Sequence, residues 1–210
     1  MARGRPRAWG LVLGVPTVIL GGYLVASGSP QTIPSAVGYP FLVLGLISTG
    51  GGYFISRMAP EQMSGDPVAV FTPNQLGAYL FAGMSVVPLV VTLYLLFFTR
   101  VPYVWPTITS AIFALTFIKA LVGYWRNSLT RYYVLEGGQV VSEYRFVSLN
   151  RSTVDAASIQ GVDRSQSAVE TLIGLGNVTV RSASGDLSFR NLTTPAEAEE
   201  VLMDVREQYG

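Results

Sequence analysis

A run of 49 residues without a charged side chain, residues 8–56, constrains the fold of this chain more than any other feature. One membrane-crossing helix needs about 20 apolar residues, so the run is too long for one helix and suits two helices and a turn. Prolines and small polar residues at 27–34 form a composition that breaks helices. The run therefore predicts two membrane spans, at about 9–26 and 36–56.

A second uncharged run, residues 67–99, and the apolar stretch after it predict two more spans, at about 75–98 and 104–125. A short turn at residues 99–103 separates them. Only 13% of the residues are charged, against about 25% in ordinary soluble domains. The sequence lacks the alternation of apolar and polar residues that a transmembrane barrel requires. We therefore predict a membrane α-helical bundle of four transmembrane helices over residues 1–125.

Basic residues at the ends of the predicted spans indicate the orientation, because such flanks tend to remain in the cytoplasm. With four spans, Arg100 lies on one side and six arginines lie on the other: Arg3, Arg5, Arg7, Arg57, Arg126 and Arg131. We therefore predict a multi-pass protein of the cell membrane with both termini in the cytoplasm. A cleaved signal peptide is the alternative for the first span, but residues 26–28 form a weak cleavage site.

Small residues recur at a spacing of four in the first two spans. Gly10 and Gly14 form a GxxxG pattern, and Ser48 and Gly52 form a weaker variant of it. This spacing lets two helix backbones approach each other closely. We expect the pattern to serve packing within the helix bundle, with self-association into a homo-oligomer as the alternative.

Four aromatic residues lie near the ends of the predicted spans: Trp9, Trp105, Tyr124 and Trp125. Aromatic side chains at these places are typical of anchors at the interface between membrane and water. We therefore expect them to contact membrane lipids. The only lysine, Lys119, lies near the cytoplasmic end of the fourth span, where its long side chain can extend to the interface.

Residues 126–210 consist of short β-rich stretches separated by turn residues. We predict strands at about 129–135, 140–146, 153–157, 159–164, 177–182 and 187–190, the first two forming a hairpin around a double glycine. Thr194, Pro195 and Glu197 then provide an N-cap, a first-turn proline and a capping box. The residues that follow predict an amphipathic C-terminal helix that covers a sheet.

Three segments of this half carry a resemblance: LTRYYV at 129–134, IQGVDRSQS at 159–167 and LIGLGNVTV at 172–180. In order and spacing they resemble the bacterial and archaeal PH-like membrane proteins. In that family a Tyr-rich strand follows transmembrane helices, an Ile-x-x-Val strand ends in Gln-Ser, and a Gly-x-Gly turn precedes the next strand. The resemblance implies that residues 126–210 form a cytoplasmic PH-like domain, an all-β barrel capped by a C-terminal α-helix. It also implies a scaffold without catalysis, although the commoner family pattern has two spans and this chain has four predicted.

The chain contains neither cysteine nor histidine, which excludes disulfides, thiol chemistry and imidazole metal sites. The acidic residues Asp155, Asp163, Glu170 and Asp186 do not have the spacing of an oxygen-ligand loop. We therefore predict no catalytic residue, no cofactor and no metal ion.

Arginines of the β-rich half are the candidates for contact with anionic lipid headgroups or with a partner: Arg145, Arg151 and Arg164. Residues 126–210 contain eight basic and eleven acidic residues, and the basic ones are dispersed. Nucleic acid is therefore not expected as a partner, because it requires a basic patch.

These observations predict a non-enzymatic adaptor that recruits a membrane or membrane-proximal protein to the cytoplasmic membrane surface. A small transporter or channel subunit is one alternative, and its mark would be polar residues that line a path between spans. A sensor of anionic lipid headgroups is another, which rests on analogy with the PH fold.

Overall fold

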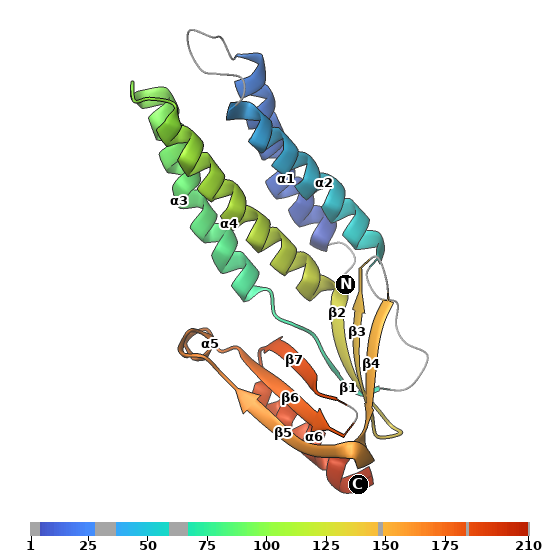
Figure 1. Ribbon diagram of the computed structural model, residues 1–210. Helices are drawn as coiled ribbons and strands as arrows, with labels where there is room; N and C mark the ends of the chain where they lie inside the picture. Colours follow the sequence, from blue (N-terminus) through green and yellow to red (C-terminus); the bar gives the residue numbers. More distant parts are fainter. Residues whose placement is uncertain (1–4, 28–36, 59–66, 147–148, 184, 210) are drawn as a thin grey trace. The chain divides into compact units, whose positions relative to one another are not determined.

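The computed structural model describes residues 5–27, 37–58, 67–146, 149–183 and 185–209 (Figure 1). The turn predicted at 27–34 and the basic residue Arg3 lie largely outside these residues. Contacts divide the chain into two compact units. The helical unit comprises Met1–Ala59 and Gly77–Trp125, and the barrel unit comprises Pro60–Leu76 and Arg126–Gly210.

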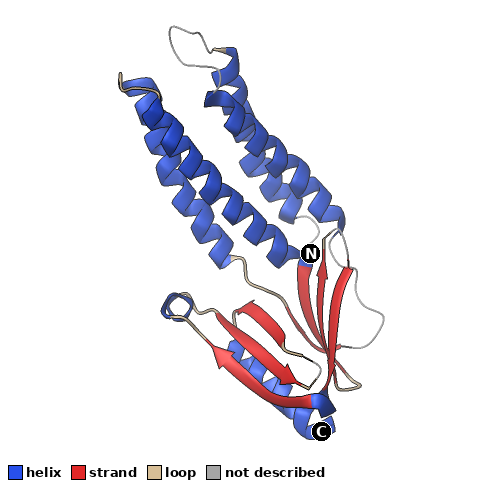
Figure 2. Ribbon diagram, in the orientation of Figure 1, coloured by secondary structure: helices blue, strands red, loops and turns tan. Residues whose placement is uncertain are grey.

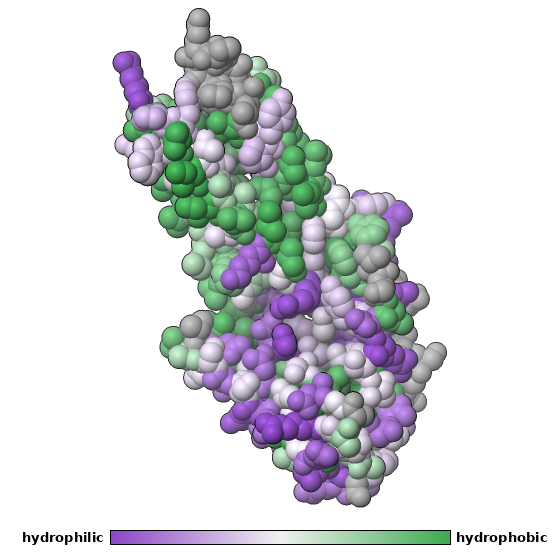
Figure 3. Space-filling model, in the orientation of Figure 1, coloured by the Kyte–Doolittle hydropathy of each residue, from purple (hydrophilic) through white to green (hydrophobic). Residues whose placement is uncertain are grey.

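In its described residues, the helical unit consists mainly of four long helices: α1 (Arg5–Ala26), α2 (Gly38–Met58), α3 (Leu76–Phe98) and α4 (Val104–Leu129). Each is long and apolar enough to cross a membrane, as the sequence predicts. Figure 3 shows hydrophobic side chains over these helices. The buried centre of the helical unit includes Phe41 of α2 and Phe113 of α4, whose rings stack with centroids 5.4 Å apart.

Seven strands form two antiparallel sheets in the described part of the barrel unit (Figure 2). The first sheet has the order β1 (Pro67–Phe71), β2 (Thr130–Leu135), β3 (Gln139–Arg145) and β4 (Leu149–Asp155). The second contains β5 (Ile159–Ser165), β6 (Gly176–Ser182) and β7 (Leu187–Leu192). The C-terminal helix α6 (Pro195–Tyr209) packs against β5, β6 and the short helix η3 (Ala156–Ser158).

Strand β1 was not predicted, because its residues were assigned to a loop between the second and third spans. It pairs antiparallel with β2, with Val70 opposite Tyr133 and Phe71 opposite Tyr132. In the sequence, the α3–α4 hairpin is therefore inserted between β1 and β2, which are neighbouring strands of one sheet. One junction between the two contact units falls at the predicted boundary, between Trp125 and Arg126, and the described residues 67–76 also group with the barrel unit.

Helix α4 also extends to Leu129, four residues beyond the predicted end of the fourth span, and β2 follows it without a loop. Strand β4 begins at Leu149 instead of the predicted residue 153. The predicted amphipathic C-terminal helix is confirmed: the backbone carbonyl of Thr194 accepts a hydrogen bond from the Ala198 N–H, and Ala198, Leu202 and Val205 are buried on one face. The capping box at its start stays a prediction.

Two of the three segments that carry the family resemblance, 159–167 and 172–180, meet at the connection between β5 and β6, which side-chain hydrogen bonds hold together. Gln166 donates its side-chain amide to the backbone carbonyl of Leu175 at 2.9 Å. Ser167 and Glu170 form a reciprocal capping box at the start of α5 (Ala168–Leu172). Gly174 has φ +68°, a conformation that favours glycine. These motif residues therefore have a structural role.

Candidate functional site

The three candidate arginines do not converge on one site. Arg145 ends β3 opposite Leu149, and Arg151 lies on β4 opposite Glu143, so both belong to the β3–β4 hairpin. Arg164 lies in the other sheet, where its guanidinium pairs with the Glu199 carboxylate of α6 at 3.5 Å. The first two are therefore the ones available to one common partner.

Strand β4 is an edge of the first sheet, and in the described residues it pairs only with β3. Six of its seven residues are exposed, Val154 being the exception. An edge strand presents unpaired backbone N–H and C=O groups that a strand of another chain can extend. Arg151 places a positive charge on this edge, which is how proteins commonly limit unselective pairing.

The predicted small-residue positions meet along a seam between α1 and α2. A Cβ atom added to Gly10 would lie 2.7 Å from the backbone oxygen of Ser48 and 3.0 Å from the Gly52 Cα. A Cβ on Gly14 would lie 2.7 Å from the backbone oxygen of Gly45. The two backbones touch here, so glycine is required by the available space. Self-association through these residues stays a prediction.

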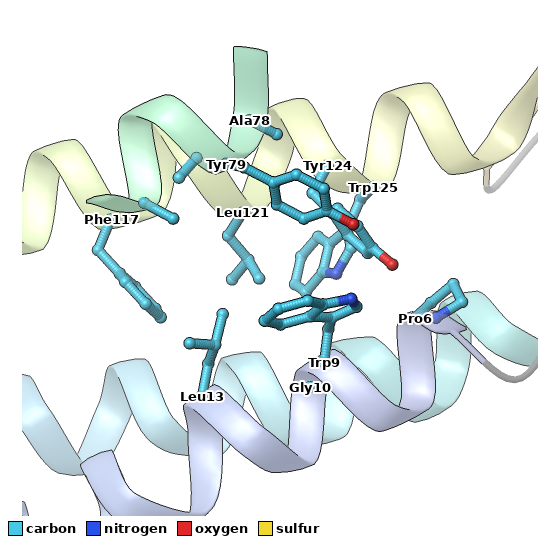
Figure 4. Close-up of a pocket in the computed structure, with 12 residues that line it drawn as sticks. Pro6, Trp9, Gly10, Leu13, Ala78, Tyr79, Phe117, Leu121, Tyr124 and Trp125 are labelled. Atoms are coloured by element: carbon cyan, nitrogen blue, oxygen red, sulfur yellow. The ribbon is translucent and has the colours of Figure 1, made fainter. Parts of the chain in front are cut away.

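Three of the four predicted aromatic anchors line a small cavity inside the helical unit (Figure 4). Trp9 packs on Tyr79 with ring centroids 5.4 Å apart, and Tyr79 lies 6.0 Å from Tyr124. Tyr124 is only 8% exposed, and the Trp125 ring occupies the space beside Gly51 that a Cβ would need. This packing against other helices was not predicted, although Trp9 remains 39% exposed and Trp105 59% exposed. A role of these residues as anchors at the membrane interface stays a prediction. The cavity has a volume of about 60 Å³ and apolar walls.

Polar side chains of the helices mostly bond to their own backbone. Thr92 donates to the Pro88 carbonyl and lies 2.8 Å from the Thr109 hydroxyl, which in turn contacts the carbonyls of Trp105 and Pro106. Threonines bonded in this way are normal packing residues of membrane helices. They do not favour the transporter alternative.

The acidic residues considered for a metal site have other roles or stand apart. Asp163 pairs with Arg181 at 2.6 Å, and Glu170 belongs to the α5 capping box. That capping lowers the Glu170 pKa, chiefly through the Ser167 N–H and then through the Asn177 side-chain amide. Among the described residues, no group of three His, Cys, Asp or Glu side chains is arranged to hold a metal ion.

A second cavity lies within the barrel unit and has a volume of about 460 Å³. Its walls come from β2, β3, β4, β7 and the end of α4, and they are mainly polar. Arg126 and Arg190 line it together with the hydroxyls of Thr130 and Ser142. None of the three candidate arginines lies in it, and the sequence analysis did not single out its residues as a group.

Two antiparallel sheets and a C-terminal helix, joined to long apolar helices, define a PH-like module with a helical region. A family model for the bacterial PH domain matches residues 78–209, nearly two thirds of the chain. The chain belongs to this bacterial PH domain family, as its resemblance indicated. The match includes nearly all of α3, all of α4 and the barrel from β2 onward, whereas α1, α2 and β1 precede it. No curated protein and no solved structure matches the chain.

Proposed function

We propose that the protein is a membrane-anchored, non-enzymatic adaptor whose barrel unit recruits a protein partner at the cytoplasmic surface of the cell membrane. Family membership supports a non-enzymatic module, since PH domains are generally not catalytic. The four long apolar helices supply the anchor, and the arginines at their ends favour cytoplasmic termini.

The observation that carries the adaptor role is the open edge of β4. Among the described residues, the backbone groups on the side of β4 away from β3 have no strand partner, all its side chains except that of Val154 are exposed, and Arg145 and Arg151 stand on the same hairpin. A partner strand that adds to this edge gains main-chain hydrogen bonds, and an acidic side chain on it gains an ion pair with Arg151. The proposed partner is therefore an extended, acidic segment of a membrane or membrane-proximal protein.

Site-specific photocrosslinking in native membranes tests this role. A photoreactive amino acid replaces Thr153 on β4 in one variant and Glu200 on the exposed face of α6 in the other. We expect a defined crosslinked protein at position 153 that is absent at position 200 and is reduced by Arg151→Glu. The proposal is wrong if position 153 gives no product, or if both positions give the same product.

A further inference from the structure

The inward face of the first sheet changes character along its strands. Its register places one cross-strand row of valines at one end, Val134, Val140 and Val154, all of which belong to the apolar core. The next two rows toward the other end carry hydroxyl and amide groups: Tyr132, Ser142 and Ser152, then Thr130, Tyr144 and Asn150. Small barrels normally fill such inward positions with apolar side chains, so the polar rows need an explanation.

Polar groups turned inward are costly unless they meet water, protein partners or a ligand. Five of the six residues in these rows, all except Asn150, line the 460 Å³ cavity, whose volume is in the range of about 300–1,000 Å³ typical of small-molecule sites. Ser152 is exposed, and Ser142 and Tyr144 are half-buried, so the cavity is open to solvent. This end of the barrel is therefore shaped as a receptor for a polar molecule.

Two arginines give the cavity its charge. Arg126 and Arg190 both line it, and among the described residues neither guanidinium is paired with a carboxylate. The hydroxyl of Tyr132, a residue that is 4% exposed, accepts a hydrogen bond from the Arg190 backbone N–H at 3.0 Å. Burial raises the pKa of Tyr132, and the Arg190 N–H and the positive charges of Arg190 and Arg126 oppose that rise. Both charges therefore act on the floor of the cavity.

Asparagines hold one wall of the cavity in place. The buried Asn127 donates its side-chain amide to the Asn74 carbonyl at 2.8 Å, and the Asn74 N–H donates to the Asn191 carbonyl at 2.7 Å. Asn191 has φ +56°, and its backbone N–H donates a further hydrogen bond to the side-chain oxygen of Asn177. A wall ordered before binding lowers the entropy cost of binding a ligand.

We propose that this cavity binds a phosphorylated polyol. Arg126 and Arg190 provide charge-assisted hydrogen bonds to the phosphate, and Asp186 together with the five lining residues of the polar rows bonds the hydroxyl groups. The single carboxylate is outnumbered by the two guanidiniums, so an anion is favoured over a neutral or cationic ligand. The same chemistry is present in a glycerophosphate lipid headgroup and in a free sugar or polyol phosphate. This binding is independent of partner recruitment at β4.

Titration calorimetry on the full chain in phosphatidylcholine nanodiscs tests the site with three probes: glycerol 3-phosphate, inorganic phosphate and glycerol. We expect glycerol 3-phosphate to bind more tightly than inorganic phosphate, and glycerol alone not to bind measurably. Arg126→Gln and Arg190→Gln each weaken the binding by about tenfold or more, since each removes a charged hydrogen-bond donor. The exposed Arg145→Gln, outside the cavity, serves as the matched control and leaves the affinity unchanged.

Ser142→Val tests the site without removing a charge, because it replaces a lining hydroxyl with a larger apolar group. We expect it to lower the affinity for glycerol 3-phosphate. Addition of phosphatidylglycerol to the nanodiscs then distinguishes the two sources. If phosphatidylglycerol abolishes the binding of glycerol 3-phosphate, the lipid headgroup occupies the site and is its ligand. If the binding is retained, the ligand of the site is a free phosphate ester. Failure of both phosphate probes to bind overturns the proposal, as does equal affinity of the wild type and the two arginine variants.

Discussion

The two ends of the barrel interior share strands but differ in what those strands contribute. At one end, β2, β3 and β4 provide valines that join Phe189 and the buried face of α6 in a continuous core. At the other end, two to four residues away on the same strands, they provide hydroxyls around an open cavity with two arginines. The contrast teaches that apolar packing is concentrated at one end, which allows the other end to be polar. Departures of this kind from the packing rule are expected at functional sites.

Truncation of the central core aromatic is the strongest test of this contrast. Phe189 is 0% exposed and stacks on Tyr132 with ring centroids 4.3 Å apart. We expect Phe189→Ala to lower the free energy of barrel opening by about 3–5 kcal/mol, because it leaves a cavity in a filled core. We expect Ser152→Ala, on the polar face, to change it by less than about 0.5 kcal/mol. Hydrogen exchange of the β6 and β7 amides measures both, and similar effects of the two substitutions would break the comparison.

The asparagine network at the polar end gives the next largest effect. Asn127→Ala removes the side-chain amide that donates to the Asn74 carbonyl, so this carbonyl loses that hydrogen bond. We expect the free energy of local opening to fall by about 1–3 kcal/mol, which is measured as faster amide hydrogen exchange at the end of β7 and the start of α3. Asn150→Ala, at an exposed position of β4, is the control. Unchanged exchange in Asn127→Ala would show that the cavity wall does not depend on this network.

The turn at the apolar end offers a matched pair of glycines. Gly138 has φ +72°, and a Cβ there would lie 2.8 Å from the Tyr209 ring, whereas nothing lies within 4 Å of a Cβ on Gly137. We therefore expect Gly138→Ala to destabilise the barrel by about 1 kcal/mol or more, from strain in the turn and displacement of the end of α6. Gly137→Ala has a smaller effect. Thermal unfolding of the two variants measures the difference, and equal midpoints would contradict this account of the closed end.

The smallest effect is a dependence on pH at the β5–β6 connection. The folded pKa of Glu170 is lowered, so the capping stabilises the fold at pH values above its usual pKa of 4.5. The stabilisation is lost as the pH falls through the folded pKa. We expect the unfolding temperature of the wild type to fall more than that of Glu170→Gln between pH 6 and pH 3. Parallel curves for the two proteins would mean that the capping box does not stabilise this connection.

Local sequence patterns were sufficient to predict the elements whose signals are continuous. The four helices follow from long uncharged runs, the β2–β3 hairpin from its double glycine, and α6 from Thr194 and Pro195 at its start. Strand β1 was missed because five residues, PVAVF, carry little signal alone. Their partner strand follows about sixty residues later in the chain, beyond a helical hairpin.

The candidate site was the least predictable part, for a related reason. Tyr132, Ser142 and Ser152 form one row only through the strand register, and Arg126 and Arg190 join them from an α-helix and a distant strand. Arginines judged by sequence spacing alone, such as Arg145 and Arg164, lie outside the cavity. Spacing does not give the register, so the sequence could not bring these residues together.

The most direct test of an open polar end and a closed apolar end uses the absence of native cysteines. Single cysteines replace Ser142 and Ser152 at the polar end, and Val140 and Val154 on the same inward face at the apolar end. The rate of maleimide labelling is then measured on the folded full chain in nanodiscs. The account predicts rapid labelling at positions 142 and 152, and labelling at 140 and 154 only after denaturation. Equal protection at all four positions would contradict it, because the cavity would then be closed.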